Sequence, residues 1–130
     1  MRSRVLIVDD ELDVLNVMKE MLDRLGFESS AVTSSVKAIE LVKDTQFDLI
    51  ITDLIMPDGN GLELIHKIRS LKQGIPIIIT AGVSLEDVNI ELNQYGLEDF
   101  IKKPFTMNDI RQKVSKFIEP EKVTIPRGGE

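Results

Sequence analysis

Four short, uninterrupted apolar runs recur along the chain, and each is rich in valine or isoleucine. They lie at residues 4–8, 47–52, 75–80 and, more weakly, 98–102. Runs of this length without polar alternation are typical of strands that are buried on both faces of a sheet. A fifth run, at residues 28–33, is more polar and fits a strand at or near one end of the sheet. The sequence therefore predicts five strands, most of them interior.

Amphipathic helical patterns separate these runs. The first ends at Gly26, as expected for a glycine just past the end of a helix. Ser34 or Ser35 can cap the second helix, Ser84 the fourth, and the last helix follows Thr106. The apolar positions recur at steps of three and four residues, in five groups: Leu12, Leu15, Met18, Leu22 and Leu25; Val36, Ile39 and Val42; Leu62, Leu64, Ile65 and Ile68; Val88, Leu92 and Tyr95; and Ile110, Val114 and Phe117.

Strands that alternate with helices predict a doubly wound α/β fold of the (βα)5 type, with a five-stranded parallel sheet. Parallel neighbours need crossover connections, and these are nearly always right-handed. A chain of 130 residues is the usual size of one domain. We expect this domain to occupy residues 1–118. Residues 119–130 contain two prolines and a Gly-Gly-Glu end without apolar periodicity, and we interpret them as a flexible tail or the start of a linker.

The composition excludes several classes of function. With 22 acidic and 16 basic residues the net charge is −6, which argues against a direct nucleic-acid partner. The chain has no cysteine, so it has neither disulfides nor thiolate sites, which suits a reducing compartment. No apolar stretch approaches the ~20 residues of a membrane span or forms a signal peptide. We expect a soluble cytoplasmic protein without a membrane contact.

Functional side chains follow the predicted strands where a ligand site would lie. Open α/β sheets bind their ligands beyond the carboxyl ends of the strands. Asp9 and Asp10 follow the run at 4–8, Asp53 follows the run at 47–52, Thr80 ends the run at 75–80, and Lys103 follows the run at 98–102. The sequence thus predicts three carboxylates, one hydroxyl and one ammonium group at one edge of the sheet.

Crowded carboxylates of this kind call for a cation. At about 4 Å, two of them repel by roughly 4 kcal/mol at an effective dielectric constant of 20. Magnesium prefers oxygen ligands and binds through one or two carboxylates together with a phosphate oxygen, which fits a cluster without His or Cys; Mn²⁺ is an expected substitute. Asp53 is then the candidate nucleophile for a phosphoryl group, Lys103 the cation beside it, and Thr80 a hydroxyl donor to a phosphoryl oxygen.

Each of these residues also has an ordinary structural interpretation. An aspartate near a strand end is often a turn former or helix cap, and we interpret Asp13 in this way. Thr80 alone could be a hydroxyl bonded to backbone, and Lys103 alone a solvated charge. His66 lies in the third helical pattern, away from acidic clusters, and is expected to face solvent or to be partly packed. Only the combination of compatible side chains at four strand ends favours a functional site over these structural interpretations.

Four segments in this order and spacing closely resemble the signature segments of the response-regulator receiver family. The resemblance covers about residues 4 to 118. The segments are Val5-Leu-Ile-Val-Asp-Asp-Glu11, Asp53-Leu-Ile-Met-Pro-Asp-Gly-Asn-Gly61, Thr80-Ala-Gly82 and Phe100-Ile-Lys-Lys-Pro-Phe105.

The resemblance implies a role for each matching residue and a flavodoxin-like strand order, 2-1-3-4-5. Asp53 is the implied phosphoacceptor, and Asp9, Asp10 and the main-chain carbonyl of Ile55 would complete the Mg²⁺ ligands. Thr80 and Lys103 would bind the phosphoryl group, with Lys103 as a catalytic cation before a cis-proline. Phe100 matches an aromatic residue that turns inward when the threonine moves, although a plain core phenylalanine stays an open interpretation.

The resemblance also implies a signalling switch and not a turnover enzyme. A sensor histidine kinase or a phosphotransfer protein would phosphorylate Asp53, and the chain would catalyse only its own phosphorylation and dephosphorylation. The surface expected to change comprises the predicted helix at 84–96, the strand at 98–102 and the helix after Thr106. An attached output domain, a partner protein or a phosphorylation-dependent homodimer would form there.

Other functions stay open at this point. Aspartyl-phosphate hydrolases also use a strand-end Asp with Mg²⁺, but position 55 is Ile, where some of them place a general acid. A flavin-binding protein is disfavoured because the Asp-Asp-Glu loop after the first run would repel a phosphate. A receiver that only binds partners is disfavoured by the complete set of site residues. The chain could act alone or as the receiver of a longer regulator.

Overall fold

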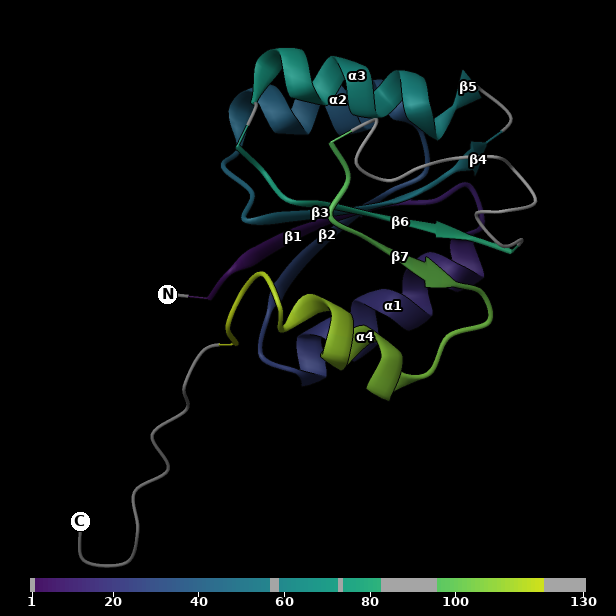
Figure 1. Ribbon diagram of the computed structural model, residues 1–130, viewed down its shortest axis with the longest axis vertical. Helices are drawn as coiled ribbons and strands as arrows, with labels where there is room; N and C mark the ends of the chain where they lie inside the picture. The colour runs from purple at the N-terminus through teal and green to yellow at the C-terminus, as the bar shows by residue number, and fades with distance from the viewer. Residues whose placement is uncertain (1, 57–58, 73, 83–95, 121–130) are drawn as a thin grey trace, which may run out of the picture.

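Five parallel strands form the central sheet of the computed structural model, which describes residues 2–56, 59–72, 74–82 and 96–120 (Figure 1). The strands are β1 (Arg4–Val8), β2 (Glu28–Val32), β3 (Leu49–Asp53), β6 (Ile77–Ala81) and β7 (Asp99–Lys102). Their order across the sheet is β2-β1-β3-β6-β7, and all neighbours are parallel. Numbered along the chain as the five strands of this sheet, this is 2-1-3-4-5, so the predicted order is confirmed. The polar run at 28–33 forms β2 at one end, as expected.

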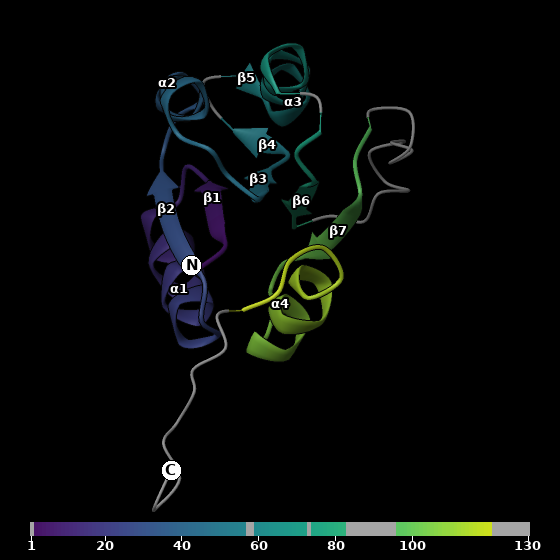
Figure 2. The same ribbon diagram turned by 90° about the vertical axis from the view of Figure 1, so that its left-hand side faces the viewer.

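Helices cover both faces of the sheet, which confirms the doubly wound architecture. Helices α2 (Ser35–Asp44) and α3 (Gly61–Leu71) lie on one face, and α1 (Leu12–Arg24) and α4 (Met107–Val114) lie on the other (Figures 1 and 2). The helix predicted to begin at Ser84 falls within residues 83–95, outside the described residues. None of the described helices is long and apolar enough to cross a membrane.

A short antiparallel hairpin connects the sheet to α3. Its strands are β4 (Ile55–Met56) and β5 (Gly59–Asn60), which pair Ile55 with Asn60 and Met56 with Gly59. This hairpin was not predicted, because two-residue strands are too short to produce a periodic pattern.

Alternate residues of the strands pack into two separate hydrophobic cores, one on each face of the sheet. In β1, Leu6 and Val8 pack in the cluster on the α2 and α3 side, whereas Val5 and Ile7 pack in the cluster on the α1 and α4 side. This alternation follows from the two-residue period of a strand. Burying each large aliphatic side chain contributes roughly 1.5–3 kcal/mol. The two-sided burial explains why these runs are apolar throughout.

The helix ends are specified by local sequence. Gly26 adopts a positive φ of 95° directly after the C-cap residue of α1, as expected for this glycine. Ser34, rather than Ser35, caps α2, and its hydroxyl accepts the backbone N–H of Lys37 at 3.3 Å. Thr106 forms a reciprocal capping box with the third residue of α4, Asp109.

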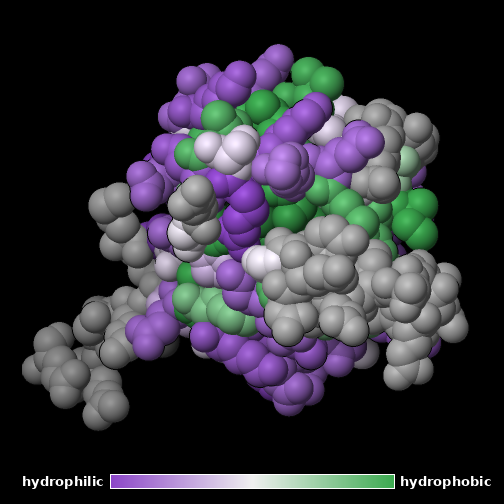
Figure 3. Space-filling view, turned by 45° about the horizontal axis from the view of Figure 1, so that its top comes forward, coloured by the Kyte–Doolittle hydropathy of each residue, from purple (hydrophilic) through white to green (hydrophobic). Residues whose placement is uncertain are grey.

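Among the described residues, two members of the predicted apolar stripes are exposed. Leu12 is 62% exposed and Val36 is 68% exposed. Each lies in the first turn of its helix, beside the loop that leads in from the sheet. The spacing of apolar residues predicts which face of a helix turns toward the sheet. It does not predict which residues of that face extend past the edge of the sheet and stay exposed. Figure 3 shows hydrophobic residues reaching the surface among hydrophilic ones on one face of the molecule.

The two ends of the described chain meet at the amino-terminal edge of the sheet. The Ser3 hydroxyl donates to the backbone carbonyl of Glu119 at 3.2 Å, and the Ser3 carbonyl accepts the backbone N–H of Glu28 at 2.9 Å. Phe117 and Ile118 pack, half-buried, against the core cluster on the α1 and α4 side. The chain thus returns at its end to the point where β1 begins.

Candidate functional site

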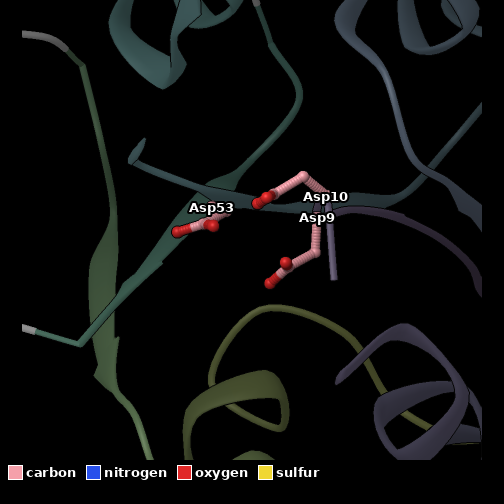
Figure 4. Close-up of side chains that lie close together, drawn as sticks. All are labelled: Asp9, Asp10 and Asp53. Atoms are coloured by element: carbon pink, nitrogen blue, oxygen red, sulfur yellow. The ribbon is translucent and has the colours of Figure 1, made fainter. Parts of the chain in front are cut away.

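Three carboxylates gather at the carboxyl edge of the sheet. Asp9 and Asp10 directly follow β1, and Asp53 is the last residue of the neighbouring strand β3. Oxygen atoms from the three carboxylates lie within 4.8 Å of one another (Figure 4). Asp9 and Asp53 are buried, whereas Asp10 is exposed. The parallel pairing of β1 with β3 therefore produces the predicted acidic cluster.

Lys103 brings an ammonium group into this cluster from the end of β7. Its Nζ atom lies 2.8 Å from Asp9 Oδ2 and 3.3 Å from Asp53 Oδ2. Its backbone N–H donates to the carbonyl of Ala81 at 2.8 Å, which holds the residue beside the end of β6. The Lys103–Pro104 peptide bond is cis, as the resemblance implied. Lys102, one residue earlier, is exposed.

Backbone groups hold the carboxylates in place. The N–H of Glu11 donates to Asp9 Oδ1 at 2.9 Å, and the N–H of Ile55 donates to Asp53 Oδ1 at a longer 3.4 Å. Glu11 had no predicted role. A signal was present, because an aspartate often accepts the backbone N–H two residues later in the turn that follows a strand.

Thr80 and Phe100 lie near the cluster but differ in their surroundings. Thr80 is buried and pairs with Asp53 in the β3–β6 register, and its carbonyl accepts the N–H of Leu54 at 2.9 Å. Phe100 is half-buried and packs against the core on the α2 and α3 side. It lines a separate pocket beside α4, which includes Lys103 but none of the three aspartates.

The cluster opens into a pocket of about 410 Å³. The exposed side chain of Ile55, which is 60% accessible, lies on its wall. The seven lining residues are Asp10, Glu11, Asp53, Ile55, Met56, Gly82 and Lys103. Four of the predicted site residues thus share one pocket, and Asp9, which does not line it, contacts Lys103.

Burial dominates the electrostatics of Asp53. Its pKa is raised from 3.8 to about 6, first by burial and then by repulsion from Asp9. The charge and hydrogen bond of Lys103, together with the Ile55 N–H, oppose this rise. Burial would lower the pKa of Lys103, but its hydrogen bond to Asp9 and the charge of Asp53 raise that pKa instead. The Asp53 carboxylate, whose charge burial disfavours, thus lies beside the ammonium group of Lys103.

Close packing behind Asp53 requires a glycine at the start of α3. The N–H of Gly61 donates to the carbonyl of Leu54 at 2.6 Å. A Cβ atom at position 61 would clash with the Asp53 carbonyl oxygen and would lie 2.9 Å from the Leu54 Cα atom. Both neighbours are backbone, so neither can rotate away. Gly61 therefore keeps α3 against the strand end that presents Asp53.

The donor set fits a divalent cation such as Mg²⁺. Three carboxylates converge without histidine or cysteine, and hard cations select oxygen donors of this kind. With the four groups ionised, three negative charges against one positive charge leave a formal local charge of −2. His66, on α3, is exposed, as predicted, and is not one of the lining residues.

Comparisons with known proteins identify the fold and the family of the chain. The chain is 27% identical over 116 residues to the response regulator SaeR of Staphylococcus aureus, covering 89% of this chain and 50% of that protein. It therefore spans about half the length of the curated relatives it matches. Its fold matches the chemotaxis protein CheY4 of Vibrio cholerae with a TM-score of 0.85, at 22% identity, over 91% of this chain and 100% of that one.

A second similar solved structure contains a metal ion. The receiver domain of the sensor histidine kinase PA1611 from Pseudomonas aeruginosa matches with a TM-score of 0.82 at 23% identity, over 90% of this chain and 98% of that one. That structure has a magnesium ion coordinated in its active-site cleft. The model of the response regulator receiver domain matches residues 5–115, which is most of the chain. The chain therefore belongs to the response regulator receiver domain family.

Proposed function

We propose that this receiver domain is a cytoplasmic signalling switch that accepts a phosphoryl group on Asp53. The family serves two-component systems in which phosphorylation is the signal. We further propose that the phosphoryl donor is a sensor histidine kinase or a phosphotransfer protein. The chain would promote its own phosphorylation and dephosphorylation without turning over an external substrate.

One observation carries the proposal. The carboxylate of Asp53 lies within 4.8 Å of those of Asp9 and Asp10 and within 3.3 Å of the Lys103 ammonium group. A nucleophilic carboxylate flanked by a metal-binding pair and a fixed cation is suited to phosphoryl transfer, because the incoming group carries negative charge that must be offset.

Asp9, Asp10, Asp53 and the main-chain carbonyl of Ile55 would hold Mg²⁺, or Mn²⁺ as a substitute. When bound, the metal would offset charge on the phosphoryl oxygens. A carboxylate oxygen of Asp53 would form the new bond to phosphorus while the phosphorus–nitrogen bond of a phosphohistidine breaks. The imidazole would leave with that electron pair and take up a proton. Lys103 would hold a phosphoryl oxygen during and after transfer.

Output would follow from contacts that exist only after phosphorylation. The added group carries about −1.5 to −2 charges, and the Thr80 hydroxyl would bond to it. Thr80 pairs with Ile101 of β7, and Ile79 pairs with Phe100, so a shift at Thr80 would reach the aromatic ring. The surface that includes β7, α4 and the sequence between β6 and β7 would then bind an output domain, a partner protein or a second copy.

The domain limits are also a proposal. We place the receiver at residues 1–118 and assign residues 119–130 to a tail or the start of a linker. Because the chain spans half of its curated relatives, an attached output domain is one interpretation and a standalone regulator is the other. The intact mass of the native gene product separates these two possibilities.

Phosphorylation by a small donor tests the site directly. The intact mass of the protein is measured after incubation with acetyl phosphate, with and without Mg²⁺. We expect one phosphoryl adduct that requires Mg²⁺ and disappears in Asp53→Ala, because Asp53 both contacts the Lys103 ammonium group and lines the open pocket, which Asp9 does not line.

Asp13→Ala is the matched control. Asp13 is an exposed acid in the first turn of α1, four residues from Asp9, and it is not one of the three clustered carboxylates. This variant should form the adduct as the wild type does. An adduct that survives in Asp53→Ala would show that the nucleophile is a different residue. The absence of any adduct in the wild type would reduce the chain to a binding module.

A further inference from the structure

The ammonium group of Lys103 occupies the carboxylate that a metal would need. Lys103 Nζ lies 2.8 Å from Asp9 Oδ2, closer than its 3.3 Å distance to Asp53 Oδ2. The other oxygen of Asp9 accepts the backbone N–H of Glu11 at 2.9 Å. Both oxygens of Asp9 therefore already have a hydrogen-bond donor.

The three carboxylates differ in how available they are. Asp9 is only 2% exposed and has two donors, and Asp53 is 5% exposed and has two more distant donors. Asp10 is exposed, and within the described part of the chain its carboxylate makes neither a hydrogen bond nor an ion pair. A cation arriving from solvent thus meets an open ligand at Asp10 and an occupied one at Asp9.

Two cations on the same carboxylate would repel each other. A divalent ion bound to Asp9 would be brought close to the Lys103 ammonium group, in a site where burial reduces screening by water. Lys103 can avoid this repulsion only by leaving Asp9, and Asp53 is the other acceptor within its reach. Binding of the metal would then require a change of partner for Lys103.

We propose that Lys103 is an internal counter-ion that competes with the divalent metal for Asp9, so that it limits the affinity of the site for Mg²⁺. This inference rests on the proposed function, in which the aspartate cluster holds the metal. Asp10 provides the first contact, and occupation of Asp9 is coupled to the departure of the ammonium group. Without metal, Lys103 partly neutralises the buried carboxylates and keeps them together.

An opposite role for Lys103 predicts the opposite result. If Lys103 only positions the carboxylates, its removal lets Asp9 and Asp53 separate, and the affinity for Mg²⁺ falls. If Lys103 competes, its removal frees Asp9, and the affinity for Mg²⁺ rises. The direction of the change therefore decides between the two roles.

Calorimetric titration of the full chain with Mg²⁺ measures this direction. Lys103→Met removes the charge and preserves much of the side-chain length, and Lys103→Gln removes the charge but keeps a hydrogen-bond donor. We expect the dissociation constant for Mg²⁺ to fall by at least about fivefold in both variants, a change of about 1 kcal/mol.

Lys102→Met is the matched control. Lys102 is the adjacent residue on β7, is exposed, and does not line the aspartate pocket. This variant removes one unit of positive charge from the neighbouring position, so it measures the general effect of a more negative protein. The dissociation constant of Lys102→Met should stay within about twofold of the wild-type value, because solvent screens an exposed charge.

The thermal midpoint provides a second measurement if the Lys103 variants lose stability. Without metal these variants should unfold at a lower temperature, because two buried carboxylates lose their cation. Saturating Mg²⁺ should raise their midpoint by more than it raises that of the wild type. A smaller rise than in the wild type would contradict competition.

The outcomes separate this inference from the proposed function. Mg²⁺ that binds the wild type but binds the Lys103 variants no more tightly than Lys102→Met overturns the competition alone. If neither the wild type nor the Lys103 variants bind Mg²⁺, both the competition and the proposed metal site fail. Tighter binding in both Lys103 variants, with Lys102→Met unchanged, establishes Lys103 as the competing cation.

Discussion

At the scale of single residues, the burial of Asp53 makes its charge costly to the fold. The folded protein raises its pKa from 3.8 to about 6, mainly through burial. The contribution of this group to stability is therefore fully present below about pH 3.8 and is lost as the pH rises through about 6. At neutral pH the metal-free protein holds an ionised carboxylate that its surroundings disfavour.

Replacing Asp53 by asparagine should therefore stabilise the metal-free protein. Above about pH 6 we expect the free energy of unfolding of Asp53→Asn to exceed that of the wild type by about 1–3 kcal/mol, since one pKa unit corresponds to about 1.4 kcal/mol. The difference should shrink as the pH falls toward 4. Urea unfolding in the presence of EDTA, repeated across this pH range, measures it.

Asp44→Asn controls for the loss of one negative charge from an acidic chain. Asp44 is an exposed residue at the end of α2. A stability gain of equal size in both variants would assign the effect to net charge. A gain in Asp53→Asn that does not depend on pH would contradict the role of burial.

Most residues of the cluster could be predicted because they end strands. Asp9, Asp10, Asp53 and Lys103 follow apolar runs that are readable in the sequence, and parallel strands bring their carboxyl ends together. The hydrogen bond from Glu11 could not be assigned with the same ease, because its donor is a backbone group that any residue except proline supplies.

At the scale of elements, the contact between α3 and the end of β3 depends on Gly61. We expect Gly61→Ala to lower the free energy of unfolding by about 1–3 kcal/mol, because the new methyl group would overlap the backbone of Asp53 and Leu54. The same displacement should slow phosphorylation by acetyl phosphate. Urea unfolding and the rate of adduct formation measure the two effects.

Gly74→Ala is the control for this substitution. No heavy atom lies within 4 Å of a Cβ atom built at position 74, in contrast to position 61. Its free energy of unfolding should change by less than about 1 kcal/mol, with a small gain expected from the lower entropy of the unfolded chain. Equal losses in both variants would mean that the crowding at Gly61 has no energetic consequence.

The helices and strands also show what the spacing of apolar residues cannot predict. The spacing of Leu15, Met18 and Leu22 identified the buried face of α1, yet Leu12 in the same stripe is exposed. The boundary between buried and exposed depends on how far the helix extends past the sheet, which is a tertiary property. The β4–β5 hairpin escaped prediction for the complementary reason, because its pairing depends on the connection between β3 and α3.

At the scale of the whole molecule, the proposed domain limit can be tested by truncation. A chain that ends at Pro120 should keep the free energy of unfolding of the full chain within about 0.5 kcal/mol. A chain that ends at Ser115 loses Phe117 and Ile118, which pack against the core, and should lose about 2–4 kcal/mol. Urea unfolding of the three lengths measures both differences.

This pair of truncations locates the boundary from both sides. A large loss on ending at Pro120 would extend the folded unit into residues 121–130. Unchanged stability on ending at Ser115 would mean that the half-buried contacts of Phe117 and Ile118 are energetically neutral.

The hydrogen bond between Ser3 and Glu119 sets the distance between the aspartate cluster and the end of the described chain. Ser3 precedes β1 and Asp9 follows it, so a rise of six residues, or about 20 Å at about 3.3 Å per residue, separates the Ser3–Glu119 contact from the aspartates. This span is more than twice the Debye length of about 8 Å at physiological ionic strength. The point at which a module would be attached after residue 120 therefore lies beyond the electrostatic reach of the phosphoryl charge. A signal would reach that point as a mechanical displacement of strands and helices, unless the module binds the surface of β7 and α4.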